Sequence, residues 1–261
     1  MERKEFLVKS ALGAVGVTAG SIQLPGESGN APEPVPARAA RKILLAGGNY
    51  NTAWIREMAR LTGKPRARIC YLPTASADSP TSTISFFKNC SPLNVEPFVQ
   101  DSFIESLSQK QGSMDGIVVS GGNTLNQQAI WKAQGIDVVL REAWDRGIVL
   151  GGASAGSLCW FDEGTTDSRP KELSIVKCLG FIKGSHSPHY DAEAGRRPLY
   201  HKLIGERAMQ PGYACDNDAG IYFEETEVKR VLSARDGAKV YFVSVVNGQV
   251  VERVLEPERI S

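Results

Sequence analysis

The stretch Gly151–Trp160 reads GGASAGSLCW and directly follows the apolar run IVL at 148–150. Within it, GASAG at 152–156 fits the pattern G-x-S-x-G, in which a serine occupies a sharp turn between a buried strand and a helix. Such a turn raises the serine side chain above the sheet, and small neighbours allow the crowded backbone. Similar residues also form ordinary turns and phosphate-binding loops, although no lysine follows here. The rest of the chain therefore decides whether Ser154 is a nucleophile.

Apolar runs that end in glycine or small polar residues alternate with helical segments from Lys42 onward. The runs are KILLAGG, ARICYLPTA, VEPFVQ, DGIVVSGG and GIVLGG, and helices are predicted over 54–61, 82–89, 124–133 and 137–147. This alternation is typical of a mainly parallel sheet with helices on both faces, a three-layer α/β sandwich. Beyond about residue 210 the chain becomes β-rich, with a hairpin turn at Asn247-Gly248. The ligand crevice is expected beyond the carboxyl ends of the parallel strands.

Composition and charge restrict the class of protein. With 261 residues, 42% hydrophobic and 23% charged, the chain is expected to form one globular catalytic domain over residues 41–261. Its 30 basic and 29 acidic residues give a net charge of +1 without long runs of one sign, which favours a small-molecule or peptide substrate over nucleic acid. The 5 cysteines form no CxxC pair, so neither a metal site nor a cofactor is predicted. The sequence leaves the oligomeric state open.

Residues 1–40 are predicted to be an export signal followed by a flexible linker. The segment RKEFLVKSALGAVGVTAG at 3–20 places a basic start before an apolar stretch that is too short and too glycine-rich for a stable membrane anchor. Its order resembles a twin-arginine signal with Lys4 in place of the second arginine. The proline-rich segment at 27–40 is typical of a linker. We expect a periplasmic or extracellular protein; a frayed N-terminus on a cytoplasmic protein is the alternative.

A serine nucleophile needs a base, and the chain contains three histidines. His189 lies in GSHSPHYD at 184–191, where Pro188 favours an extended backbone that can present a side chain to a cleft. His186, in the same segment, is a weaker candidate, and His201 lies in a helical stretch. We therefore expect His189 to be the base.

Backbone amides near the serine are expected to form an oxyanion hole. The N–H groups that follow Ser154, beginning with Ala155, have no acceptor within the new helix. The turn Gly121-Gly122-Asn123 ends a neighbouring strand and offers a second donor from Gly121 or Gly122. Asn123 is expected to contact the substrate.

Three segments carry a resemblance to a known family. SGGNT at 120–124, GGASAGSLCWFDEGTTDS at 151–168 and LGFIKGSHSPHYD at 179–191 resemble, in order and spacing, the serine peptidases of the peptidase E (aspartyl dipeptidase) and cyanophycinase family. The resemblance runs from about Lys42 through most of the chain. It implies a flavodoxin-like fold related to class I glutamine amidotransferases, with serine in place of their cysteine. It also implies Ser154 as nucleophile, His189 as base and Gly122 in the oxyanion loop.

The acidic member of the triad is expected among three aspartates. Asp167 ranks first, because it matches an acidic residue that the family carries after the serine turn. The family also carries a glutamate in a later strand region, where this sequence has Asn217 between Asp216 and Asp218. A neutral asparagine stabilises an imidazolium poorly, so Asp216 and Asp218 compete with Asp167.

The resemblance also implies an arginine that grips an acidic side chain of the substrate. Arg196 and Arg197 follow the histidine segment, and a guanidinium suits bidentate pairing with a carboxylate. Tyr190, beside His189, is expected to line the same pocket. The predicted function is a serine exopeptidase or dipeptidase that hydrolyses short peptides, including those with an acidic first residue, through an acyl-enzyme. The alternatives are a cyanophycinase-like amide hydrolase and a non-catalytic binding protein on the same fold.

Overall fold

The computed structural model describes residues 39–102 and 114–261. The predicted export signal and nearly all of its linker lie outside the described residues. In the part of the chain that is described, no helix combines the length and the apolar character needed to cross a bilayer.

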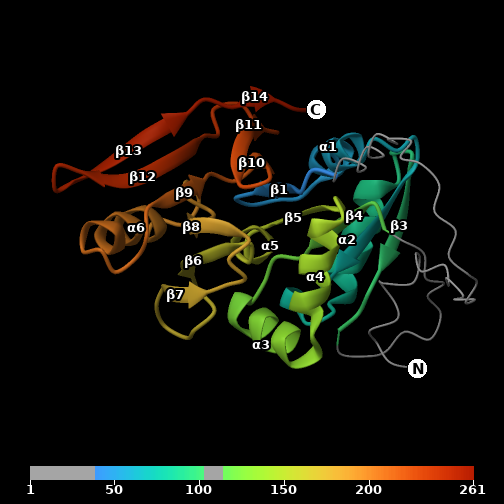
Figure 1. Cartoon of the computed structure of the whole chain (residues 1–261), viewed down its shortest axis with the longest axis horizontal. Coiled ribbons are helices and arrows are strands. Elements are labelled where there is room, and N and C mark those ends of the chain that lie inside the picture. The colour runs from blue at the N-terminus through green and yellow to red at the C-terminus, as the bar shows by residue number, and fades with distance from the viewer. Residues whose placement is uncertain (1–38, 103–113) are drawn as a thin grey trace, which may run out of the picture.

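An eight-stranded sheet forms the centre of the molecule (Figure 1). Its strands, in spatial order, are β14 (Glu258–Arg259), β11 (Glu227–Ser233), β10 (Ala219–Glu224), β1 (Lys42–Ala46), β5 (Val149–Ala153), β4 (Gly116–Val119), β2 (Ala67–Leu72) and β3 (Val95–Val99). The run β1-β5-β4-β2-β3 is parallel, whereas β10 pairs antiparallel with both β1 and β11. The prediction of a mainly parallel sheet is confirmed for this run.

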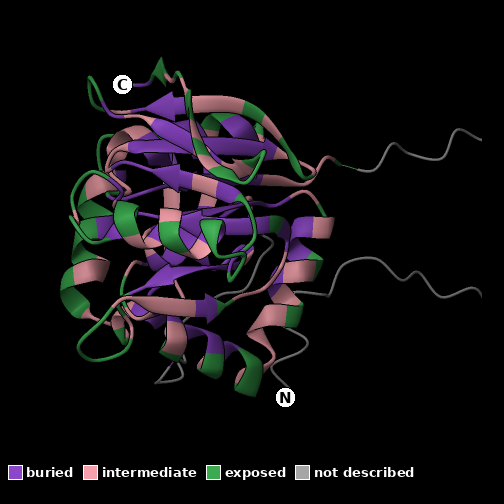
Figure 2. Cartoon of the chain, turned by 90° about the vertical axis from the view of Figure 1, so that its left-hand side faces the viewer, coloured by how far each residue is buried: buried purple, intermediate pink, exposed green. Residues whose placement is uncertain are grey.

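Helices cover both faces of this sheet. On one face, α1 (Thr52–Thr62) and α2 (Pro80–Cys90) pack with Leu44 and Ala46 of β1. On the other, α3 (Thr124–Gln134) and α4 (Ile136–Asp145) pack with Ile43 and Leu45. Successive side chains of a strand point to opposite faces, so β1 contributes to two cores. Figure 2 shows the central strands largely buried, with exposed residues on outer helix faces, loops and the outer strands.

A second sheet of six strands packs beside the first. Its order is β13 (Gln249–Leu255), β12 (Val240–Val246), β9 (Gly212–Cys215), β8 (Ile182–Ser187), β6 (Phe161–Thr166) and β7 (Ser174–Lys177). The strands β6, β8 and β9 are parallel, and the outer strands are antiparallel. Helix α6 (Arg196–Gly205) packs on this sheet through Tyr200 and Ile204.

The β-rich C-terminal portion is divided between the two sheets, which the sequence did not predict. Strands β10, β11 and β14 extend the first sheet, and β12 and β13 extend the second. Buried side chains such as Phe161 and Val240 join the second sheet to the same core as Ile43 and Leu45, so both sheets share one apolar interior. The hairpin predicted at Asn247-Gly248 is confirmed: both residues have positive φ, and Val246 pairs with Gln249.

Candidate active site

Ser154 lies at the junction between β5 and the short helix α5 (Ala155–Leu158) with φ 58° and ψ −119°, a conformation that non-glycine residues rarely adopt. A Cβ added to Gly152 would lie 2.3 Å from the Val119 carbonyl oxygen, so only glycine fits before the turn. The helix predicted here is a single turn, because Phe161 already begins β6 and leads the chain into the second sheet. The sharp turn presents the Ser154 hydroxyl at the end of the central strands.

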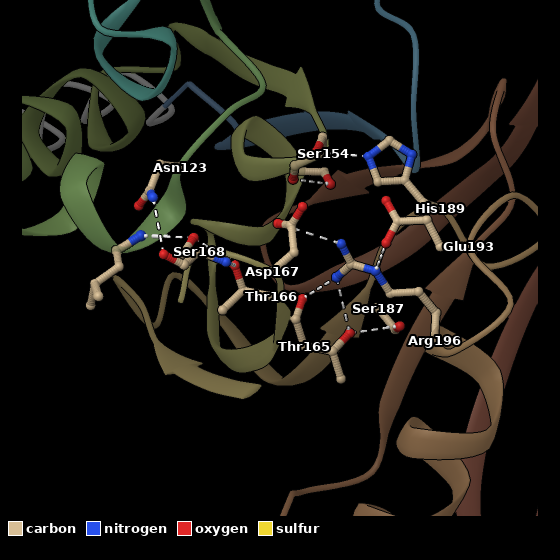
Figure 3. Close-up of polar contacts among 12 residues, drawn as sticks. Asn123, Ser154, Thr165, Thr166, Asp167, Ser168, Ser187, His189, Glu193 and Arg196 are labelled. Carbon is tan, nitrogen blue, oxygen red and sulfur yellow. Dashed lines mark hydrogen bonds and ion pairs between the residues drawn. The ribbon is translucent and has the colours of Figure 1, made fainter. Parts of the chain in front are cut away.

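His189 faces this hydroxyl from the segment after β8. Its Nε2 atom lies 2.8 Å from Ser154 Oγ (Figure 3), a distance at which an imidazole can remove the hydroxyl proton. The backbone of His189 also has a positive φ of 54°, and its N–H donates to the carbonyl of Gly47 at 3.3 Å. The structure thus brings together the two residues predicted as nucleophile and base.

The other nitrogen of His189 is held by Asn217. Its Nδ1 atom lies 2.7 Å from Asn217 Oδ1, in the loop between β9 and β10. An amide oxygen can only accept, so Nδ1 carries the imidazole proton and Nε2 presents its lone pair to Ser154. The geometry therefore gives the third position of the triad to Asn217.

The aspartates predicted for that position lie elsewhere. The Asp167 carboxyl is 68% exposed and lies 3.8 Å from Arg196 Nη2 (Figure 3). Asp216 accepts from the Lys239 N–H at 2.8 Å, and Asp218 accepts from Asn49 at 3.2 Å. Among the residues that the structure describes, none of these carboxylates bonds to His189, so this geometry does not support the ranking with Asp167 first.

Asp216 nevertheless has an unusual environment. The residue is buried, and its Oδ1 atom has no hydrogen-bond partner in the described part of the chain. Burial raises the pKa of the Asp216 carboxyl to about 6, against the lowering effect of the Lys239 N–H. Asp216 is therefore a titrating group directly beside the residue that holds His189.

Backbone groups around Ser154 are placed to bind an oxyanion. A Cβ on Gly121 would lie 3.3 Å from Ser154 Cβ, so the Gly121-Gly122 turn directly adjoins the nucleophile. The turn is fixed by the Asn123 N–H, which donates to the Ala75 carbonyl at 2.8 Å. Within residues 39–102 and 114–261, the amides of Gly121 and Gly122 donate to no backbone carbonyl. Together with the amide of Ala155, which follows the nucleophile, they are the candidate oxyanion donors.

A second histidine, His186, supports the turn at Ser154 through Ser157. His186 Nε2 lies 2.9 Å from Ser157 Oγ, which itself lies 2.8 Å from the Ser154 carbonyl oxygen. The other ring nitrogen faces the Tyr213 carbonyl at 3.1 Å, and the ring stacks on Phe161. Burial lowers the pKa of His186 to about 3, so the ring is neutral and structural. Sequence patterns did not reveal this brace, since it joins residues from two strands and a helix.

Of the predicted substrate-binding residues, Arg196 is buried, with its guanidinium between Glu193, Asp167 and the Thr165 carbonyl (Figure 3). Its side chain is 2% exposed, with Nε 2.6 Å from Glu193 and Nη1 2.6 Å from the Thr165 carbonyl. The third nitrogen, Nη2, faces Asp167 at 3.8 Å, beyond hydrogen-bond distance. The guanidinium is thus surrounded by two carboxylates and a carbonyl, and Asp167 is the more exposed of the two carboxylates.

The other predicted substrate residues serve the fold. Arg197 pairs with Glu252 and stacks over Tyr190. Tyr190 is buried and donates to Glu252 at 2.8 Å, so it belongs to the core beneath α6. Asn123 caps α3 through Oδ1 and donates to the Ser168 carbonyl at 3.1 Å. The expectation that these three line the pocket is not supported, because their polar groups are already satisfied.

Residues 43–231 match Peptidase family S51. The chain belongs to this family. The S51 chain is 39% identical over 220 residues to the uncharacterized peptidase YgaJ of Bacillus subtilis (strain 168), across 80% of this chain and 94% of YgaJ. The S51 assignment confirms the resemblance to the peptidase E and cyanophycinase family.

Two solved structures share the fold of this S51 chain. A putative peptidase E protein from Listeria monocytogenes EGD-e matches with a TM-score of 0.54 and 18% identity, over 84% of this chain and 100% of that one. A peptidase from an acI-B1 Actinobacterium matches with a TM-score of 0.64 and 14% identity, over 86% of this chain and 97% of that one. These likenesses confirm the α/β architecture.

Proposed function

We propose that this S51 chain is a serine peptidase that hydrolyses short peptides through an acyl-enzyme on Ser154. The observation that carries the proposal is the chain of two hydrogen bonds from Ser154 through His189 to Asn217, at 2.8 and 2.7 Å. This arrangement supplies a nucleophile, a base in the correct tautomer and a group that orients the base.

The reaction follows from this geometry. Ser154 Oγ attacks the peptide carbonyl while His189 Nε2 takes its proton, and the resulting oxyanion is held by the amides of Ala155 and the Gly121-Gly122 turn. His189 then gives the proton to the departing amine, which leaves an ester on Ser154. A water molecule, deprotonated by the same imidazole, hydrolyses this ester and restores the free enzyme.

Arg196 supports a preference for a substrate carboxylate. Its charge is held in a buried position by Glu193 and by the Thr165 carbonyl, and its Nη2 atom makes a longer ion pair, at 3.8 Å, with the exposed Asp167. A buried guanidinium gains more from a carboxylate than an exposed one, because water competes less. We infer that peptides with an acidic first residue are the preferred substrates.

A panel of dipeptides tests this function, with the first residue Asp, Glu, Asn, Gln, Leu or Lys and a constant second residue. Hydrolysis that requires Ser154 and favours the acidic peptides supports the proposal. Equal cleavage of Asp and Asn peptides removes the acidic preference, and the Arg196→Lys variant then shows whether Arg196 has another role. A wild-type protein that a fluorophosphonate labels on Ser154 but that cleaves no dipeptide points to a branched or isopeptide substrate of the cyanophycinase kind.

A binding protein without turnover is the alternative from another class. The neutral Asn217 in place of a carboxylate favours it, because imidazolium stabilisation is weaker. Absence of fluorophosphonate labelling in a folded wild-type protein, together with saturable peptide binding, would establish that alternative.

Export remains a separate proposal, carried by the sequence of residues 1–40. We expect the natively produced protein to begin within the linker at 27–40 and to be recovered outside the cytoplasm. Protein sequencing of the N-terminus in each cell fraction tests this, and an intact Met1 in the cytoplasm contradicts it.

A further inference from the structure

The backbone of Asn217 is clamped by an ion pair between Asp191 and Arg235, two residues outside the proposed triad of Ser154, His189 and Asn217. The Asn217 N–H donates to Asp191 Oδ1 at 2.8 Å, and the Asn217 carbonyl accepts from Arg235 Nη2 at 3.0 Å. The same Arg235 Nη2 donates to Asp191 Oδ2 at 2.5 Å. Both polar groups of the Asn217 backbone are thus held by one Asp–Arg pair.

The clamp also joins the two segments that carry the base and its partner. Asp191 is two residues beyond His189, so it belongs to the same segment as the base. This segment is fixed to the opposite loop by a second bond, from the Tyr190 N–H to the Cys215 carbonyl at 3.1 Å. Arg235 reaches the pair from the turn after β11, and its Nε atom lies 3.5 Å from Asp218 Oδ2. A change at Asp191 therefore acts on the relative placement of His189 and Asn217.

An asparagine needs such support more than a carboxylate would. A carboxylate presents two equivalent oxygens and attracts the imidazolium by charge, whereas an amide accepts through one oxygen and is misplaced by a half-turn of its side chain. Within the residues that the structure describes, the Asn217 side chain makes its one hydrogen bond to His189. Its orientation is therefore set by the backbone that carries it.

The geometry points to Asp191 and Arg235 as a positioning pair that holds Asn217 against His189 and so activates Ser154. This role rests on the proposed serine chemistry, but not on any particular substrate. The rate at which a fluorophosphonate modifies Ser154 therefore measures it directly, together with the downfield proton NMR signal of the His189 Nδ1–H.

The experiment compares Asp191→Asn and Arg235→Gln with the wild-type full chain. We expect each to lower the labelling rate about tenfold or more and to broaden or shift the Nδ1–H signal, since each removes a charged hydrogen bond to the Asn217 backbone. Arg235→Lys should retain more of the labelling rate than Arg235→Gln, because it keeps a positive charge. Asp236→Asn is the matched control, because this neighbouring side chain is 95% exposed and pairs with Arg259 at 3.3 Å.

A double-mutant cycle separates this role from general stability. If Asp191 acts through Asn217, then Asp191→Asn should lower the labelling rate of Ser154 by less than about twofold in an Asn217→Ala background, where there is no side chain to orient. Equal losses in both backgrounds, or a wild-type rate and an unchanged Nδ1–H signal in Asp191→Asn, would overturn the proposal. A wild-type protein that is labelled but hydrolyses no peptide contradicts the proposed peptidase function and leaves this measurement intact.

Discussion

Asn217 and His189 are joined by a 2.7 Å hydrogen bond between an amide oxygen and the Nδ1 atom of the imidazole. The bond fixes which nitrogen faces Ser154, yet it brings no charge to the base. A neutral group thus orients the imidazole here, so orientation is separated from the charge that a carboxylate would add.

Substitution of Asn217 tests this division. We expect Asn217→Ala to lower kcat/KM about a hundredfold or more, because the imidazole loses its orienting acceptor. Asn217→Asp should keep kcat/KM within about tenfold of wild type, because a carboxylate also accepts a hydrogen bond from Nδ1. Steady-state kinetics on the best dipeptide measure both, and a fully active Asn217→Ala would remove Asn217 from the triad.

Ser154→Ala should abolish hydrolysis and covalent labelling while the fold is retained. Loss of a serine nucleophile lowers turnover by about a millionfold in well-studied peptidases. Circular dichroism and thermal unfolding confirm the fold, and mass spectrometry locates the label. Substantial hydrolysis by the variant on every substrate of the parent would show that Ser154 is structural.

Substitution of Asp167 or Asp218 should affect activity less than substitution of Asn217. Asp167→Asn and Asp218→Asn are expected to keep kcat within about tenfold of wild type, because neither carboxylate bonds to His189. The Asp167 variant should change mainly KM, since its carboxyl faces Arg196. Measuring kcat and KM separately on acidic and neutral dipeptides distinguishes these effects. A loss of about a thousandfold in kcat for Asp167→Asn would restore it as the acid of the triad.

Gly48 controls whether the base and its partner can meet. A Cβ at this position would lie 2.0 Å from Asn217 Oδ1 and 2.8 Å from His189 Nδ1. Gly48→Ala should therefore separate the two side chains and lower the labelling rate of Ser154 to that of Asn217→Ala. Gly195→Ala is the control, since its nearest neighbour is the end of the Leu173 side chain at 3.3 Å. Normal activity in Gly48→Ala would show that the loop tolerates a shift.

Asp216 should make stability depend on pH in a defined direction. Burial raises its pKa to about 6 in the folded protein, so below about pH 4 the carboxyl is protonated in both folded and unfolded chains. As the pH rises through 6, the folded state bears the cost of a buried charge. Denaturant unfolding should thus show Asp216→Asn gaining stability relative to wild type between pH 4 and pH 7. A pH-independent difference would contradict the raised pKa.

Local patterns predicted the elements and the two central residues of the site. Apolar runs ending in small residues marked the parallel strands, and the serine turn and Pro188 marked where Ser154 and His189 leave them. Those signals are local, because they depend on strand ends and turn chemistry.

The third triad position could not be predicted in this way. It depends on how the β9–β10 loop crosses the end of β1, where Gly48 forms a bridge with Asn217. It also depends on α6, which packs on the second sheet and places Arg196 3.8 Å from the Asp167 carboxyl. Contacts between segments far apart in the sequence decide both, and no local pattern encodes them.

The position of β1 between β5 and β10 has a consequence for the newly made protein. Lys42 pairs with both Val149 and Glu224, so the first strand of the domain gains its second neighbour late in translation. Contacts of such long range form slowly and require most of the chain to be present. A ribosome-bound chain that ends before β10 therefore lacks one neighbour of β1 and the support that Arg235 gives to Asn217. The contacts that place Asn217 against His189 form only after synthesis of the chain is nearly complete.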